Sequence, residues 1–283
     1  SIQARRALGD DRGGLGGGGT EVCAMPPSSP ARILFIGNSL TYWSGGLDNM
    51  FRNWGFDAHS ETIPGATLAK HWRSGQARAK ILEGWDMIVL QDDLPEYKPL
   101  PHDSRERWQV VCERFVPILG KFVEAARLVD ASSILYMAHP YERLPHTSLR
   151  DICWAHKCAE ESLGVHIAPG GLAHSLITSA RQLEESHFTL LDDDLEHPSE
   201  EGLYLHALTI VAVCFGKDKV RDLQWAPPTL SDTCVDMFKR LACDSLDAWQ
   251  AYPSPPSSEV AKLAISVASA QSQGERREGS ILT

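Results

Sequence analysis

The chain has 283 residues, of which 43% are apolar and 23% charged, and its net charge is −10 at pH 7. This length fits one large domain, and the apolar fraction is enough for a full core. An acidic surface repels phosphate backbones and anionic membranes, so the composition argues against nucleic-acid binding. No segment approaches the roughly 18 consecutive apolar residues of a membrane span.

The cysteine content predicts free thiols rather than a disulfide framework. There are seven cysteines, an odd number, and no pair has the CxxC spacing of a zinc or redox site. Free thiols are typical of a reducing compartment, which predicts a cytoplasmic protein. Arg5 and Arg6 are followed by no apolar stretch, so we expect no secretory signal in the sequence as it stands. Because the first residue is Ser1 rather than Met, an organelle transit peptide upstream stays open.

The two ends of the chain differ in composition from its middle. Residues 1–30 contain a glycine run and then a Pro/Ser-rich linker, which cannot bury a face and are expected to be disordered. A second Pro/Ser-rich stretch opens a tail, 251–283, that we also expect to be largely disordered. The folded domain is therefore predicted over residues 31–250.

Short apolar runs alternate with helical patterns along this domain. The runs predict buried strands at 33–36, 59–63, 87–90, 133–137 and 165–167. Helices are expected at 46–54, in one or two pieces before 83, and at 103–129, 147–163, 171–183, 199–215 and 231–249. This alternation predicts an α/β fold: a doubly wound, five-stranded parallel sheet with helices on both faces. Such sheets bind ligands at the carboxyl ends of their strands.

The first strand ends in Gly-Asn-Ser-Leu-Thr at residues 37–41. A small Gly lets the chain turn sharply, and a Ser at this tip points its hydroxyl above the sheet, next to its own backbone N–H. Ser39 is therefore a candidate nucleophile whose N–H can bind an oxyanion. The alternative is that Ser39 is an ordinary helix N-cap.

A second candidate segment precedes the helix at 199–215. Asp194 and His197 are three residues apart in an acidic loop, a spacing at which a carboxylate can hold the Nδ1–H of an imidazole and present Nε2 to a serine. The alternative is an acidic surface loop with a solvated His.

Together these segments resemble the SGNH/GDSL hydrolases. The block at 37–41 resembles the first block of that family, with Asn38 in place of the usual Asp, and the segment at 194–202 resembles its late DxxH block. The resemblance spans about residues 31–216. It implies a flavodoxin-like fold and a serine esterase with Ser39 as nucleophile, His197 as base and Asp194 as its orienting carboxylate. It implies no metal and no cofactor.

The same resemblance implies two more oxyanion donors. One is the N–H of Gly65, after the second strand; the alternative is a plain turn glycine. The other is normally an Asn in a GxND motif after the third strand, but this sequence has Gln91 followed by two aspartates. Either the Gln91 amide replaces that Asn, or it merely caps the strand. Without the Gln91 amide, the oxyanion hole, which is the set of N–H donors that binds the oxyanion, has two donors. One lost donor costs on the order of 3 kcal/mol of transition-state stabilisation.

Other residues near the strand tips are weaker candidates. Asn38, Trp43 and His139 are expected to line the pocket, although a loop His is more often structural. A hard-cation site formed by Asp92, Asp93, His102 and Asp103 is disfavoured, because such ligands are usually more closely spaced.

The sequence thus predicts a hydrolase that cleaves carboxylic esters. The resemblance favours short acyl groups, such as acetyl esters on sugars. Two alternatives stay open: an acyltransferase that uses the same triad, and a non-catalytic carbohydrate-binding or scaffold domain of the same fold. Neither the oligomeric state nor the natural substrate follows from the sequence.

Overall fold

A computed structural model describes residues 30–94, 106–144, 148–181 and 188–255 of the chain. Nearly all of the expected disordered segments at 1–30 and 251–283 lies outside these residues, as do His102 and Asp103. Six cysteines lie within them, and all six are free thiols, as expected. None of the helices in the described ranges combines the length and the apolar character needed to cross a bilayer.

The centre of the molecule is one parallel sheet whose strand order is β2-β1-β3-β4-β5. The order 2-1-3-4-5 is that of flavodoxin-like, doubly wound proteins, so the predicted fold class is confirmed. Each strand lies within two residues of its predicted position. The strands are β1 (Arg32–Gly37), β2 (Asp57–Thr62), β3 (Met87–Leu90), β4 (Ser132–Tyr136) and β5 (His166–Ala168).

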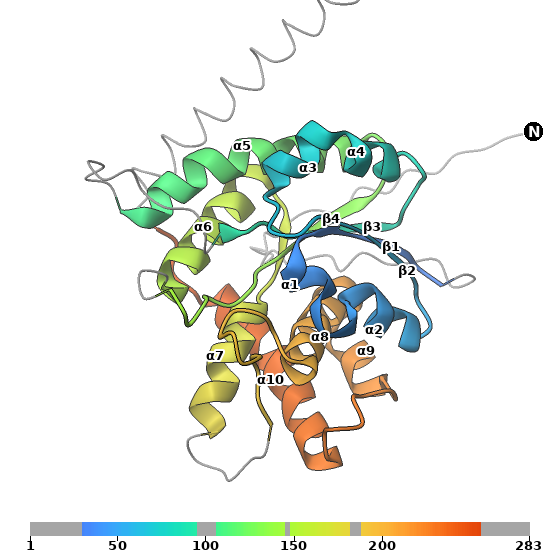
Figure 1. The fold of residues 1–283 in the computed structure, drawn as a ribbon, viewed down its shortest axis with the longest axis vertical. Helices are drawn as coiled ribbons and strands as arrows, with labels where there is room; N and C mark the ends of the chain where they lie inside the picture. The colour runs from blue at the N-terminus through green and yellow to red at the C-terminus, as the bar shows by residue number, and fades with distance from the viewer. Residues whose placement is uncertain (1–29, 95–105, 145–147, 182–187, 256–283) are drawn as a thin grey trace, which may run out of the picture.

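Helices cover both faces of this sheet. In Figure 1, α3, α4 and α5 lie on one side, and α2, α8, α9 and α10 lie on the other. Three short elements, α1, η1 and α9, were not expected from the sequence. The helices are α1 (Ser39–Tyr42), η1 (Trp43–Gly45), α2 (Leu47–Asn53), α3 (Leu68–Ser74), α4 (Gln76–Ile81), α5 (Arg107–Arg127), α6 (Leu149–Leu163), α7 (Gly170–Arg181), α8 (Glu200–Phe215), α9 (Lys217–Asp222) and α10 (Asp232–Gln250).

The sheet divides the core into two layers. In β1, Ile33 and Phe35 pack into the layer that holds α2, α8 and α10, whereas Leu34 and Ile36 pack into the layer that holds α3 to α6. All four side chains are completely buried, which explains why β1 is apolar without alternation. Full burial of one such side chain contributes roughly 1.5–3 kcal/mol, so this strand is held firmly on both faces.

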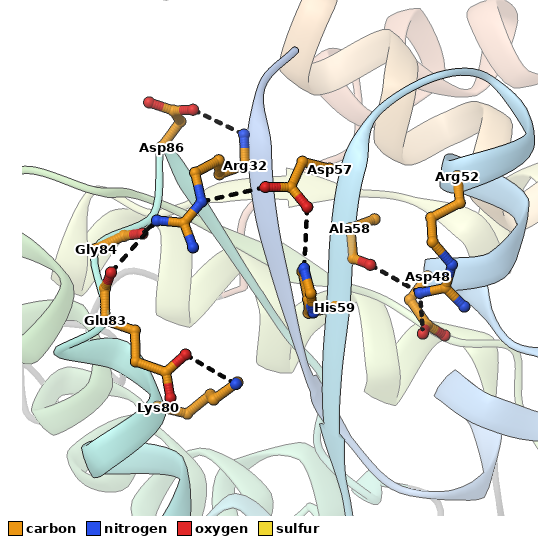
Figure 2. Close-up of polar contacts among 10 residues, drawn as sticks. All are labelled: Arg32, Asp48, Arg52, Asp57, Ala58, His59, Lys80, Glu83, Gly84 and Asp86. Carbon is orange, nitrogen blue, oxygen red and sulfur yellow. Dashed lines mark hydrogen bonds and ion pairs between the residues drawn. The ribbon is translucent and has the colours of Figure 1, made fainter. Parts of the chain in front are cut away.

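A polar network joins the amino ends of β1, β2 and β3 (Figure 2). The Arg32 side chain donates to Asp57 (3.2 Å) and to backbone carbonyls before β3, while its backbone N–H donates to Asp86 (2.7 Å). His59 Nε2 contacts the other oxygen of Asp57 at 2.9 Å. These bonds satisfy the strand starts, so this end of the sheet is structural.

The opposite end of the sheet holds the topological switch point. The chain leaves β1 toward β2 on one side and reaches β3 on the other, so the carboxyl ends of β1 and β3 flank the position where ligands bind in such folds. Gly37 is paired with Thr62, and Ile36 with Leu90. The segments that begin with Ser39 and Gln91 therefore start side by side.

Candidate active site

Ser39 is the first residue of α1, two residues after the end of β1. Asn38 is the N-cap of this helix: its Oδ1 accepts from the Leu40 N–H at 2.9 Å. Ser39 is therefore free of the capping role that was its alternative explanation. Gly37 has no room for a side chain, because an added Cβ would lie 2.6 Å from Gln91 Oε1 and would also meet the Thr41 hydroxyl. The glycine thus permits the tight approach of β3's end to the Ser39 turn.

Gln91 holds the Ser39 turn through its oxygen. Oε1 accepts from the Asn38 N–H at 2.8 Å and from the Thr41 hydroxyl at 3.1 Å, while Nε2 donates to the carbonyl of Asp92 at 2.9 Å. A backbone N–H can only donate, so the atom that faces it must be the amide oxygen. The Gln91 oxygen therefore fixes the turn, and one N–H of its amide is taken up by the Asp92 carbonyl.

The loop at 192–198 presents an ordered Asp–His pair. Asp194 Oδ2 lies 2.6 Å from His197 Nδ1, and its Oδ1 accepts from the N–H groups of Glu196 (3.0 Å) and His197 (2.9 Å). The Asp192 N–H closes the loop by donating to the His197 carbonyl at 2.9 Å. The carboxylate thus binds the backbone and the ring of its own turn at once, which fixes both the position and the tautomer of the imidazole.

These hydrogen bonds also determine the charge of Asp194. Desolvation by burial would raise its pKa, but the bonds from the His197 side chain and from the two backbone N–H groups outweigh that effect and lower the pKa to about 2. Asp194 is therefore a carboxylate at neutral pH. A carboxylate is what a neighbouring imidazole needs when it takes up a proton.

Three contacts join the Ser39 turn to this loop. The Trp43 ring stacks on the His197 ring with centroids 4.0 Å apart and an interplanar angle of 17°, and its Nε1–H donates to Asp192. The Ser44 hydroxyl donates to the carbonyl of Pro198 at 2.8 Å. The N–H of Trp43 donates to the Ser39 carbonyl, so the tryptophan lies one helical turn after Ser39. The imidazole is thereby docked beside the turn that carries the serine.

The reactive atoms of the two segments carry no other hydrogen bonds within the described part of the chain. His197 Nε2 is buried without a partner, and the Ser39 hydroxyl bonds to no described residue, His197 included. Ser39 itself is 8% exposed. Catalytic hydrogen bonds are often long in the absence of substrate and shorten in its complex. Neither atom is thus engaged by another described residue.

Gly65 lies at the second strand tip, in a turn closed by the Ala66 N–H and the Ile63 carbonyl at 3.1 Å. Pro64 precedes Gly65. The φ of Gly65 is +55°, so this turn requires a residue that tolerates positive φ. Among the described residues, the backbone N–H groups of Gly65 and Ser39 have no acceptor. The two N–H groups thus lie at the tips of neighbouring strands without an acceptor among the described residues.

The three expected pocket residues differ in accessibility. Trp43 is half-buried, whereas Asn38 and His139 have no exposed surface at all. His139 Nε2 lies 2.8 Å from the Glu196 carbonyl, so it supports the backbone next to His197. Asn38 and His139 thus support the site from within rather than lining its surface.

Sequence reasoning missed the residues that join the two segments. Ser44 and Asp192 were assigned no role, and Trp43 was expected only as a pocket wall. One signal was present: Trp43 follows Ser39 by four residues, the spacing of one helical turn. Ser44 and Leu195, one in each segment, have φ of +48° and +56°. Non-glycine residues rarely adopt such values, and they cluster at functional sites.

Comparisons with known proteins find similarity in the fold but not in the sequence. The sequence matches no protein-family model and no curated protein. Among solved structures, a DUF4886 family protein from Bacteroides uniformis has a TM-score of 0.55 at 15% identity, over 77% of this chain and 95% of that chain. An acetylxylan esterase from Geobacillus stearothermophilus, in the form of a catalytic mutant, has a TM-score of 0.49 at 15% identity, over 68% and 97%. BT4096, a gut microbial diltiazem-metabolizing enzyme, has a TM-score of 0.47 at 15% identity, over 68% of this chain and 48% of that chain.

Proposed function

We propose that this protein is a serine esterase of the SGNH/GDSL kind that its motifs resemble. The observation that carries the proposal is the His197 ring, held by Asp194 through Nδ1 at 2.6 Å and stacked on Trp43 one turn after Ser39. A neutral imidazole held in this way has its lone pair on Nε2. That atom is the general base that a serine hydroxyl needs.

The reaction is acyl transfer in two halves. Ser39 Oγ attacks the ester carbonyl carbon as His197 Nε2 takes the hydroxyl proton, and the C–O bond to the alcohol then breaks as the imidazolium returns that proton to the leaving oxygen. In the second half, water attacks the acyl-enzyme with His197 again as base, and the acid leaves while Ser39 regains its proton. The Asp194 carboxylate stabilises the imidazolium in both halves.

The N–H groups of Ser39 and Gly65 are proposed to hold the oxyanion. Gln91 contributes indirectly, because its oxygen fixes the backbone of Asn38 and so the direction of the Ser39 N–H. A hole with two backbone donors in place of three is weaker by the equivalent of one donor, about 3 kcal/mol. We therefore expect a functional esterase with a modest turnover number.

A fluorophosphonate probe tests the nucleophile directly. We expect covalent labelling of the wild-type protein and turnover of p-nitrophenyl acetate, and both should fall by at least about 10⁴-fold in Ser39→Ala. Ser179→Ala, which removes an exposed hydroxyl on α7, serves as the matched control and should behave like the wild type. A folded wild-type protein that neither labels nor hydrolyses any ester would leave the scaffold or carbohydrate-binding alternative.

Substrate preference is a separate part of the proposal. We propose short acyl groups, because the resemblance of the two motifs to the SGNH/GDSL hydrolases favours them. A series of p-nitrophenyl esters from acetate to octanoate should give its highest kcat/KM at acetate. Adding an alcohol acceptor distinguishes the acyltransferase alternative: a transferase forms the new ester in preference to the free acid, whereas an esterase releases acid at an unchanged rate.

A further inference from the structure

Three buried histidines meet next to the candidate active site. They are His139 at the end of β4, His174 in α7 and His206 in α8, and one ring nitrogen of each lies within 4.8 Å of those of the other two. The His139 ring is stacked on His174 at 4.9 Å and on His206 at 5.3 Å. His139 and His206 have no exposed surface, and His174 is 8% exposed. No carboxylate or thiol belongs to this group.

Two of the rings use one nitrogen to bind the protein around them. His139 Nε2 donates to the Glu196 carbonyl at 2.8 Å, which leaves a lone pair on Nδ1 of the neutral ring. His206 Nδ1 lies 2.6 Å from the hydroxyl of Tyr136. Metal-bound imidazoles are commonly oriented in this way, with the second nitrogen bonded to a backbone carbonyl or another polar group.

The remaining nitrogens have no partner within the described residues. Nδ1 of His139, Nδ1 of His174 and Nε2 of His206 are all buried and form no hydrogen bond. An unsatisfied buried polar atom lowers the stability of the fold by about 1–3 kcal/mol, and here three such atoms lie in one place. The His139 and His174 rings lie nearly parallel, at 19°, so they cannot satisfy each other by an in-plane hydrogen bond.

The packing of α7 brings His174 to the other two. An added Cβ on Gly171 would lie 2.6 Å from the Ala138 carbonyl, and one on Gly170 would lie 3.0 Å from His206 Cδ2. Two successive glycines therefore allow the start of α7 to lie directly against the end of β4 and against α8. Larger residues at these two positions would move His174 away from His139, so the close contact of the three histidines depends on the two glycines.

We propose that His139, His174 and His206 form a binding site for a divalent transition-metal ion, with zinc as the best fit. Three imidazoles and no carboxylate suit zinc or its neighbours rather than calcium or magnesium, and they leave one coordination position for water or an anion. Zn–N bonds of about 2.0 Å in a tetrahedral site put the nitrogens roughly 3.3 Å apart. Binding therefore requires the ligating nitrogens to approach by about 1.5 Å at most, and the His139 and His174 rings to rotate out of their stack so that both lone pairs point at the ion.

Burial prepares these rings as ligands. Desolvation lowers the pKa of His139 to about 4, and that of His174 to about 3, and it also lowers the pKa of His206. Burial thus favours the neutral form of these rings, which is the form that binds metal. An ion on Nδ1 of His139 would also strengthen its Nε2–H donation to Glu196, the residue before His197. The site would thus stiffen the loop that carries the proposed base.

Metal binding can be measured without any assay of activity. The full chain, without a histidine tag and stripped with a chelator, is titrated with Zn²⁺ in a calorimeter and dialysed against Zn²⁺ for elemental analysis. We expect one ion per chain. His174→Gln, at the least buried ligand, should weaken Zn²⁺ affinity by at least about 100-fold. His59→Gln, an exposed imidazole, and His156→Gln, a buried one outside the cluster, should leave it unchanged.

A spectroscopic measurement on the wild type keeps the proposal falsifiable if a variant fails to fold. X-ray absorption of the Zn²⁺ form should show nitrogen neighbours at about 2.0 Å with the outer-shell signature of three imidazoles, and no sulfur at about 2.3 Å. The absence of stoichiometric Zn²⁺ binding would overturn the proposal. So would a sulfur ligand, or a folded His174→Gln that binds Zn²⁺ as tightly as the wild type.

Discussion

In the part of the chain that the structure describes, two His–Asp pairs lie at opposite ends of one sheet. At the amino end, His59 Nε2 lies 2.9 Å from Asp57 and the ring meets Trp85 edge-on at 5.3 Å. At the carboxyl end, His197 Nδ1 lies 2.6 Å from Asp194 and the ring is stacked on Trp43 at 4.0 Å. Both pairs even lower the pKa of their aspartate.

The difference lies in what surrounds each pair. The His59 side chain is 49% exposed, and Arg32 shares its aspartate, so this pair belongs to a solvated network that joins strand starts. The His197 side chain is 13% exposed, its second nitrogen is buried without a hydrogen-bond partner, and its ring is stacked on Trp43. A His–Asp contact is therefore no evidence of catalysis by itself. Position at the carboxyl end of the sheet, and burial of the imidazole nitrogen that has no partner, make the distinction.

The largest expected difference between the two pairs comes from removing the charge of the aspartate in each. Asp194→Asn should lower kcat for p-nitrophenyl acetate by about 10⁴-fold, because an amide favours the wrong tautomer of His197. Asp57→Asn makes the same chemical change at the other end of the sheet and should leave kcat within about two-fold of the wild-type value. Equal losses of kcat in both variants, measured on proteins with matching circular dichroism spectra, would contradict a specific catalytic role for the Asp194–His197 pair.

A smaller loss is expected when the stacking of His197 is removed. Trp43→Leu takes away both the ring and its bond to Asp192, and a displaced base typically costs about 100-fold in kcat. Trp43→Phe keeps an aromatic face but loses the N–H, so it should retain most of the activity. Steady-state kinetics with KM and kcat separated would show the change in kcat. If Phe and Leu were equally damaging, the bond to Asp192 would matter more than the stack.

Gln91 distinguishes support of the serine turn from direct contact with substrate. Gln91→Leu leaves the buried N–H of Asn38 and the Thr41 hydroxyl without their acceptor, so we expect the free energy of unfolding to fall by about 1–3 kcal/mol. Urea unfolding measures this change, and Gln224→Leu at an exposed position is the control. An oxyanion donor would instead lower kcat and leave stability unchanged.

The pH dependence of stability gives the smallest effect. The pKa of Asp194 is about 2 in the folded state against 3.8 for the free side chain, so its ionised form stabilises the fold above about pH 4. That contribution is lost as the pH falls toward 2. The stability difference between the wild type and Asp194→Asn should therefore shrink from pH 6 to pH 2, as followed by urea unfolding. Asp57→Asn should show the same sign, since the pKa of Asp57 is also lowered.

Local patterns predicted most of the framework. Apolar runs placed all five strands, and amphipathic periodicity placed the long helices, because both depend on neighbours in sequence. The short elements α1, η1 and α9 were missed, since four to six residues carry too little periodicity to be recognised. The serine at the tip of β1 and the Asp194–His197 turn were also predictable, because strand ends and Asx-type turns are local features.

The sequence by itself thus determined the fold class and the two segments that the proposed chemistry needs. Tertiary structure alone decided that Trp43 joins those segments, that Gln91 faces the turn with its oxygen, and which His–Asp pair lies at the switch point. It also brought together His139, His174 and His206, which no spacing in the sequence connects. Such meetings depend on how helices pack on a sheet, and a contact between distant residues leaves no periodicity in the chain from which to predict it.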